Sequence, residues 1–261
     1  MKQNVSSSIT TEMFEQREKH RRSLFSNVWS QLVPKVFKDV PRYYRPGNIV
    51  ASLGLWEIWV WQFVRTIKLL PQYQVLDVCA GTNDVGIRLR KKEPLISVTA
   101  IDRSQEMQSE GQRRAKKTGL PIASVIQDVH KLPFPDSSFD VITLQAASRH
   151  LQLDKVLPEI FRVLKPGGYF YHCDMLKPNN PVVEWLYLRF LRISVFMTSL
   201  IFGSTETTRK CNGYFGDAIH HFYTTDEFSD VLQLIGFSNV RCKRSIWGGM
   251  VGFHAAQKSS I

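Results

Sequence analysis

The sequence predicts a doubly wound α/β fold built as one large domain. Short apolar runs alternate with amphipathic stretches from residue 75 onward. This alternation of strands and helices favours a parallel sheet with helices on both faces. The chain has 261 residues, of which 43% are hydrophobic, so it is long and apolar enough to bury a sizeable core.

The predicted elements follow one another in a regular order. Seven strands are expected, at residues 75–79, 97–101, 123–127, 139–144, 168–173, 240–243 and 250–256. Helices are expected between them, at 85–90, 105–117, 153–163 and 225–234. We expect these seven strands to form one mixed sheet.

Two regions depart from this alternation. Residues 1 to about 20 are polar and expected to fray, whereas residues 25–70 predict two or three helices, the last over Trp56–Leu70. Residues 178–216 predict an apolar, partly basic helical insertion. We therefore divide the chain into an N-terminal helical region, 1–70, which would cover a substrate site, and a main domain, 71–261.

Composition limits the environment and the partners. The formal net charge is +11, which suits nucleic acid, an anionic membrane surface or an acidic substrate, and equally a plain solvated basic surface. The four cysteines show no C-x-x-C spacing, so neither a zinc site nor a disulfide framework is expected, and a reducing cytoplasm fits best. No secretory signal is recognised, and no apolar run reaches the ~18 residues of a membrane span.

The segment 75–86 reads VLDVCAGTNDVG and predicts a ligand site. An apolar strand containing Asp77 leads through Ala80 and Gly81 into a helix. Small residues let a ligand lie against the backbone, and the helix N-terminus offers unpaired N–H groups. The same pattern would also fit an ordinary strand-to-helix turn.

Two acidic residues end the next two strands. Asp102, followed by Arg103, ends the second strand, where a carboxylate suits the two hydroxyls of a ribose. Its alternative role is to cap the helix that starts near Ser104. Asp128 ends the third strand and could accept a hydrogen bond from an adenine amino group.

Further along, residues 134–142 read FPDSSFDVI and residues 162–168 read RVLKPGG. In this order and spacing the segments between 75 and 174 resemble the class I S-adenosylmethionine-dependent methyltransferases. The resemblance implies a Rossmann-like fold and S-adenosylmethionine as cofactor. It implies cofactor contacts from Thr82, Asp102, Arg103, Asp128, Val129 and Gln145, the last standing where a serine is usual.

The flanking segments resemble a narrower group, the ubiquinone/menaquinone biosynthesis C-methyltransferases. The matching positions are Tyr44, Asn48, Ser52, Gly54 and Trp59, together with GGMVGFH at 248–254. This resemblance implies methylation of a ring carbon of a prenylated benzoquinol or naphthoquinol. It also implies that Tyr44, Asn48 and Trp59 contact the substrate.

The substrate-side Arg–Asn pair of that family falls on Arg149 and His150, with His150 replacing the usual asparagine, and both are candidate catalytic residues. A quinol carbon is a poor nucleophile until a neighbouring hydroxyl loses its proton. Arg149 would stabilise the phenolate or order a water, because guanidinium stays protonated. His150, with an ordinary pKa near ~6.5, is a candidate base. His221 is a further candidate substrate contact, or simply part of a closing loop. No metal site is expected.

The apolar helices at 56–70 and 181–202 would line a groove for an isoprenoid tail, or serve as plain core. Arg189 and Arg192 would then hold the enzyme on anionic lipid, at the inner face of the membrane. A homodimer is left open. Two other functions remain: methylation of a small phenolic natural product or a phospholipid amine, and nucleic-acid binding without catalysis. The last is disfavoured because no base-flipping motif or aromatic stacking platform is present.

Overall fold

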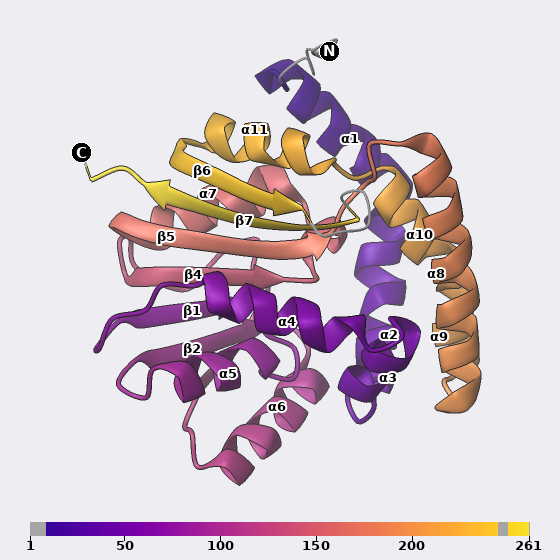
Figure 1. Ribbon diagram of the computed structural model, residues 1–261, viewed down its shortest axis with the longest axis horizontal. Coiled ribbons are helices and arrows are strands. Elements are labelled where there is room, and N and C mark those ends of the chain that lie inside the picture. Colours follow the sequence, from indigo (N-terminus) through magenta and orange to yellow (C-terminus); the bar gives the residue numbers. More distant parts are fainter. Residues whose placement is uncertain (1–8, 245–249, 261) are drawn as a thin grey trace.

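The computed structural model describes residues 9–244 and 250–260. Within them, seven strands form one sheet in the order β3-β2-β1-β4-β5-β7-β6 (Figure 1). The pairings from β3 to β5 are parallel, and β7 runs antiparallel to both β5 and β6. The strands are β1 Gln74–Val78, β2 Ser97–Asp102, β3 Ala123–Ile126, β4 Phe139–Gln145, β5 Leu164–Met175, β6 Phe237–Arg244 and β7 Val251–Lys258. The predicted doubly wound, seven-stranded mixed sheet is confirmed.

Helices cover both faces of this sheet and form two separate cores. One core joins α1 (Thr11–Asn27), α7 (Leu153–Val163) and α11 (Thr225–Ile235) to the sheet. The other joins α4 (Leu55–Thr66), α5 (Asp84–Lys92) and α6 (Gln105–Thr118) to the opposite face. Neighbouring side chains on β1 enter different cores: Val75 enters the second and Leu76 the first.

The ends of the helices follow local sequence chemistry. Ser104 caps α6 by accepting a hydrogen bond from the N–H of Met107, and Gly119 ends this helix in a left-handed conformation. Thr224 and Glu227 form a reciprocal capping box at the start of α11. These two helices were predicted within a few residues because both signals are local.

The N-terminus differs from the prediction. Residues 11–20 are not frayed but belong to α1, which continues through a π-helical turn (Val28–Leu32) into α2 (Val33–Asp39). Glu18 and Arg21 of α1 are fully buried as an ion pair. The charged side chains of this buried pair make the segment polar. Its hydropathy therefore did not predict that the helix packs against the rest of the protein.

The other helices gather where the parallel strands end. They are α3 (Tyr44–Ala51), the short 3-10 helix η2 (Ser148–His150), α8 (Pro181–Ile201), α9 (Glu206–Lys210) and α10 (Asn212–His220). Figure 1 shows α8 standing beside α2, α3 and α10 at the end of the sheet to which β5 points. The N-terminal helices and the insertion therefore cover the end of the sheet at which the parallel strands finish. In the described parts of the chain, no helix has the length and apolar character needed to cross a membrane.

Candidate active site

The bend after β1 brings together the two features predicted to form the ligand site. Cys79 and Gly81 both have positive φ, 54° and 52°. The N–H of Gly81 donates to one carboxylate oxygen of Asp102 at 2.9 Å, and the N–H of Ser104 donates to the other at 2.9 Å. The carboxylate is thus fixed by two backbone groups, and each oxygen keeps a lone pair for a further donor.

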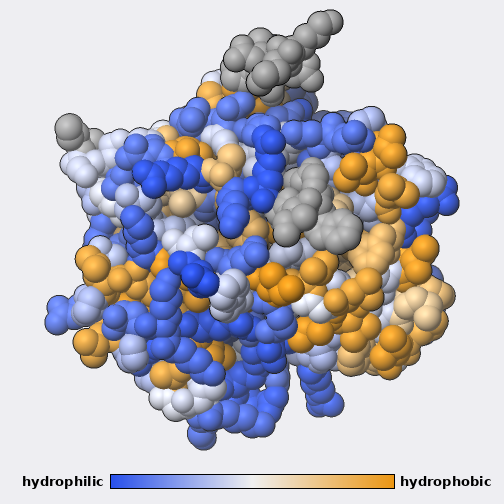
Figure 2. Space-filling view, viewed as in Figure 1, coloured by the Kyte–Doolittle hydropathy of each residue, from blue (hydrophilic) through white to orange (hydrophobic). Residues whose placement is uncertain are grey.

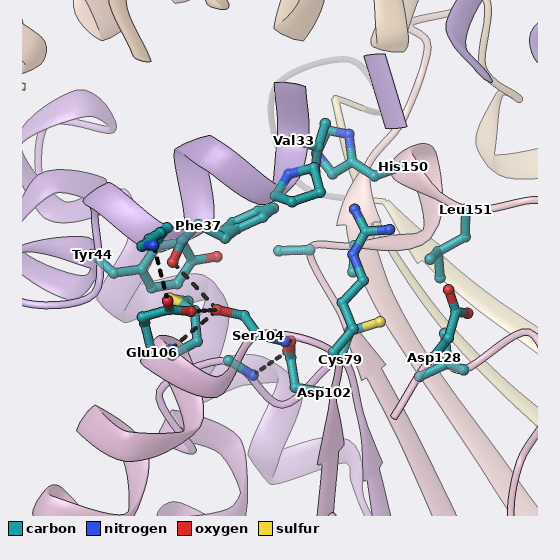
Figure 3. A pocket seen from close by; sticks show the side chains of 18 of the residues that line it. Val33, Phe37, Tyr44, Cys79, Asp102, Ser104, Glu106, Asp128, His150 and Leu151 are labelled. Atoms are coloured by element: carbon teal, nitrogen blue, oxygen red, sulfur yellow. Dashed lines mark hydrogen bonds and ion pairs between the residues drawn. The ribbon is translucent and has the colours of Figure 1, made fainter. Parts of the chain in front are cut away.

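A cavity of about 360 Å³ opens over this bend. Figure 3 shows Cys79 and Asp102 on one side of it, with Phe37, Tyr44 and His150 facing them. Six of the predicted cofactor contacts line this cavity: Gly81, Asp102, Arg103, Asp128, Val129 and Gln145. Carboxylates at the strand ends, beside small and apolar residues, fit a nucleoside with a ribose diol.

Three other predicted contacts are not among the lining residues. The buried carboxylate of Asp77 accepts a hydrogen bond from the hydroxyl of Thr143 at 2.7 Å. Thr82 accepts one at its hydroxyl from Arg114 at 2.8 Å, and the N–H of Ala80 donates to the carbonyl of Ile101 at 3.2 Å. These bonds hold the bend in place, and direct cofactor contacts by the three residues stay predictions.

The two carboxylates that line the cavity differ in their electrostatics. Burial raises the pKa of Asp102 above its ordinary value. Asp128 is more exposed, and its hydrogen bond with the ring of His130 lowers its pKa to about 2. Arg103 donates to the carbonyl of Trp29 at 2.8 Å, which ties this end of the cavity to the N-terminal helices.

A second cavity, of about 180 Å³, lies between α3, α4 and α8. Five predicted substrate and catalytic residues line it: Tyr44, Asn48, Trp59, Arg149 and His150. The lining is otherwise mostly apolar and aromatic. The two cavities share the lining residues Phe37, Tyr44, Ala146 and His150, so they adjoin at these residues.

Arg149 is buried and oriented by Asp174, which lies on β5 next to β4. Its guanidinium is ion-paired with Asp174, whose other carboxylate oxygen accepts from the hydroxyl of Ser148 at 2.6 Å. Ser148 also lies 2.8 Å from His172 Nε2. The Nε of Arg149 is buried and, among the described residues, has no hydrogen-bond partner.

His150 is buried beside Arg149 and bound by Tyr214 of α10. The distance from its Nδ1 to the Tyr214 hydroxyl is 2.6 Å. Burial and, after it, the positive charges of Arg149, Arg21 and Arg103 hold the pKa of His150 well below its usual range. The imidazole is therefore neutral at physiological pH.

His221 is not among the lining residues of either cavity. Its ring packs against those of His20 and Phe25, with centroids 5.3 and 5.9 Å away. A substrate contact by His221 stays a prediction that neither cavity supports. Across residues 9–244 and 250–260 the structure contains no group of three or more His, Cys, Asp or Glu side chains that could hold a metal ion.

Sequence reasoning missed several lining and supporting residues. Asp174 carried a usable signal, since it is an acidic residue at the end of an apolar strand. Phe37 and Tyr214 carried none, because each reaches the site from a helix whose orientation only the tertiary structure defines. Gly248 and Gly249 of the C-terminal motif lie outside the described residues, whereas the rest of it, from Met250 to His254, leads into β7.

Two sequence relatives are named for quinone biosynthesis or for methylation of a benzoquinol. The chain is 32% identical over 237 residues to the ubiquinone/menaquinone biosynthesis C-methyltransferase UbiE of Bartonella quintana, covering 87% of this chain and 88% of that one. It is 29% identical over 246 residues to the mitochondrial 2-methoxy-6-polyprenyl-1,4-benzoquinol methylase of Drosophila melanogaster, covering 87% and 80%.

Solved structures share the fold at lower identity. An S-adenosylmethionine-dependent methyltransferase from Aquifex aeolicus has a TM-score of 0.55 and 20% identity, covering 81% of this chain and 98% of that one. Phosphoethanolamine N-methyltransferase 2 of Haemonchus contortus, solved with S-adenosyl-L-methionine, has a TM-score of 0.58 and 15% identity, covering 79% and 53%.

The family match extends over most of the chain. The model of the ubiE/COQ5 methyltransferase family aligns with residues 25–258, which include both cavities and the whole sheet. The protein is a methyltransferase that uses S-adenosyl-L-methionine. It belongs to the ubiE/COQ5 methyltransferase family.

Proposed function

We propose that this protein methylates a ring carbon of a prenylated quinol, either a demethylmenaquinol or a ubiquinol precursor. The observation that carries the proposal is the meeting of the two cavities at Phe37, Tyr44, Ala146 and His150. One cavity has the carboxylates of a nucleoside site, and the other is apolar enough for a greasy ring. The names of the two relatives give the same acceptor class.

The first cavity would hold S-adenosylmethionine, whose sulfonium makes a methyl carbon electrophilic. Asp102 would accept from the ribose hydroxyls and Asp128 from the adenine amino group. Val129 would pack on the adenine, and Gly81 would let the ligand approach the backbone. Arg103 and Gln145 line the same cavity and complete the set. This part of the chain orients the donor, because alignment of donor and acceptor supplies most of the rate.

The second cavity would orient the acceptor ring and stabilise its charge. A quinol carbon attacks more readily when a neighbouring hydroxyl is ionised, so an anionic oxygen needs partners. Arg149 is buried, positively charged and held by Asp174, and its Nε is unpartnered among the described residues. We assign Arg149 to stabilising the phenolate oxygen of the acceptor. Tyr44, Asn48 and Trp59 would form the walls around the ring.

The prenyl tail would leave the cavity along α8. The outer face of α8 exposes several large apolar side chains, and Figure 2 shows hydrophobic residues gathered on the side of the molecule where α8 stands. They include Val182, Trp185, Leu186, Ile193, Phe196, Met197 and Ile201. The inner face of the same helix lines the second cavity through Tyr187, Leu191 and Val195.

We assign this exposed face to peripheral contact with an anionic membrane, on its cytoplasmic side. The chain has a net charge of +11, and Arg189 lies exposed on the same helix, 4.6 Å above the ring of Trp185. Apolar burial together with positive charge is the combination that binds anionic interfaces. A homodimer formed through this face is the competing arrangement, and sedimentation at several protein concentrations distinguishes the two.

The test is methyl transfer to a defined acceptor. The purified full chain would receive S-adenosylmethionine carrying a ¹³C methyl group and short-chain demethylmenaquinol or 2-methoxy-6-prenyl-1,4-benzoquinol, kept reduced. Mass spectrometry and NMR of the product should place the label on a ring carbon. Label on a phenolic oxygen would mean that the enzyme methylates phenols at oxygen. Label only on a phospholipid amine offered in parallel would make that amine the acceptor. Either result would contradict ring-carbon methylation of a quinol.

A further inference from the structure

Side chains of helix α1 form hydrogen bonds with the backbone on both sides of His150. Arg21 is fully buried, and its Nη2 donates to the carbonyls of Arg149 at 2.9 Å and Leu151 at 3.2 Å, the two residues that flank His150. Its Nη1 pairs with Glu18, which accepts a bond from the N–H of Leu153 at 2.8 Å. The family match begins at residue 25, so Glu18 and Arg21 precede it.

The N-terminal helices also act on the side chain of His150 indirectly, because Trp29 is hydrogen-bonded to Tyr214 and Tyr214 to His150. The indole N–H of Trp29 donates to the Tyr214 hydroxyl at 2.8 Å. Because an indole N–H can only donate, the tyrosine oxygen is the acceptor in this bond. The hydroxyl hydrogen of Tyr214 is then free to point to its other partner, His150 Nδ1, at 2.6 Å.

If Tyr214 donates its hydroxyl hydrogen to Nδ1, this bond determines which nitrogen of His150 carries hydrogen. The ring of His150 is neutral, since burial and the charges of Arg149, Arg21 and Arg103 disfavour the imidazolium. A neutral imidazole has one N–H group and one acceptor nitrogen. With Nδ1 accepting from Tyr214, the hydrogen lies on Nε2, for which the described residues supply no partner.

We propose that His150 acts as a hydrogen-bond donor to an oxygen of the acceptor ring, held in this state by Arg21, Trp29 and Tyr214 as positioning residues. The inference rests on the proposed function, because it assigns a role toward that same acceptor. His150 lines both cavities, so its side chain lies where the two cavities adjoin. Together, Arg149 and His150 supply a charge and a neutral N–H to the same developing phenolate.

A donated hydrogen bond from His150 affects both the proton transfer and the choice of acceptor ring. His150 does not remove the hydroxyl proton, because its acceptor nitrogen is already occupied by Tyr214. That proton passes to a water molecule ordered by Arg149. As the ring carbon bonds to the methyl group, the sulfur–methyl bond breaks, S-adenosylhomocysteine leaves, and the ring carbon loses its hydrogen as a proton to water. A ring without an oxygen next to the reacting carbon would leave the Nε2–H buried and unpaired, which binding disfavours. The site therefore selects oxygenated rings even where the apolar walls would accept others.

The first test reads the hydrogen position directly and needs no acceptor. ¹⁵N NMR of the full chain with labelled histidine reports which ring nitrogen of His150 carries hydrogen, and His150→Asn identifies the signal by its loss. At pH 7 we expect the Nε2–H form. In Tyr214→Phe, which removes only the hydroxyl, we expect a mixture of both neutral forms. A wild-type ring protonated on Nδ1, or on both nitrogens, would overturn the inference.

The second test separates a donor from a base. An asparagine keeps an N–H donor but is no base, so His150→Asn should lower kcat less than about tenfold, whereas His150→Leu should lower it a hundredfold or more. If His150→Asn lost as much as His150→Leu, and the pH profile of kcat lost a limb, His150 would be the base instead. An enzyme inactive on every quinol would remove the proposed function, while the NMR result would still decide the state of His150.

Discussion

The carboxylate of Asp102 accepts a hydrogen bond of 2.9 Å from the backbone N–H of Gly81. The two residues follow neighbouring parallel strands, β1 and β2, in which Val78 pairs with Ile101. The carboxyl ends of these strands therefore meet, and the bend and the acid form one wall of the first cavity.

We predict that a side chain at Gly81 would obstruct cofactor binding. A Cβ added at Gly81 would lie 3.0 Å from the terminal carbon of Met107, another residue that lines the cavity. Gly81→Ala should weaken binding of S-adenosylhomocysteine at least tenfold in calorimetry. Gly119→Ala is the matched control, because Gly119 also has positive φ, 67°, but nothing lies within 4 Å of an added Cβ. Equal affinity in both variants would show that Gly81 needs no open space.

Arg149 should matter for the rate more than for binding. Lysine keeps the charge but cannot reproduce the guanidinium geometry held by Asp174, so Arg149→Lys should lower kcat by about 10²-fold or more with a smaller change in KM. Arg162→Lys serves as the control, since Arg162 is absent from the lining of both cavities and pairs with Glu159. Steady-state kinetics that show a change confined to KM would contradict the role assigned to Arg149.

The outer face of α8 predicts lipid binding that depends on its apolar side chains. Trp185→Glu and Ile193→Glu should each reduce flotation with anionic liposomes, because they place a charge at the interface. Leu95→Glu changes an equally exposed apolar residue in the turn before β2 and should leave flotation unchanged. Rising salt should weaken the wild-type interaction. If all three variants float like the wild type, α8 is not the membrane contact.

Asp77 predicts a dependence of stability on pH. Burial raises its pKa from the ordinary 3.8 to about 7 in the folded protein. Between about pH 4 and pH 7 the unfolded chain binds fewer protons at this group, so the free energy of unfolding falls as pH rises through that window. Asp77→Asn removes this loss and should be more stable than the wild type at pH 8, by up to about 4 kcal/mol.

Urea unfolding at pH 5 and pH 8 measures the effect. The wild type should lose stability between the two values, and Asp77→Asn should lose less. Parallel behaviour of the two proteins would mean that Asp77 stays ionised in the fold throughout this range.

The sheet and the bend could be predicted because their signals are local. A strand ends in small residues at Gly81, and acids follow the next two strands at Asp102 and Asp128. Long-range partners leave no such pattern. Nothing near Arg21 in the sequence indicates that it binds the carbonyls of residues 149 and 151, and nothing near Tyr214 indicates that it reaches His150.

The direction in which a side chain points also depends on tertiary contacts that the sequence does not show. Thr82 follows the bend in sequence, yet its hydroxyl is bound by Arg114 of α6. His221 lies at the end of the insertion, and its ring packs against α1 instead of lining a cavity. In both places a tertiary contact decided the direction of the side chain.

Calorimetric titration of the wild type, Asp102→Ala and the remote control Asp136→Ala with S-adenosylhomocysteine decides whether the first cavity binds the methyl donor. Asp102→Ala should weaken binding by about 1–3 kcal/mol, because the ribose hydroxyls lose their buried acceptor. Asp136→Ala, an exposed residue absent from the lining of either cavity, should bind like the wild type. Unchanged affinity in Asp102→Ala would contradict the assignment of this cavity to the methyl donor.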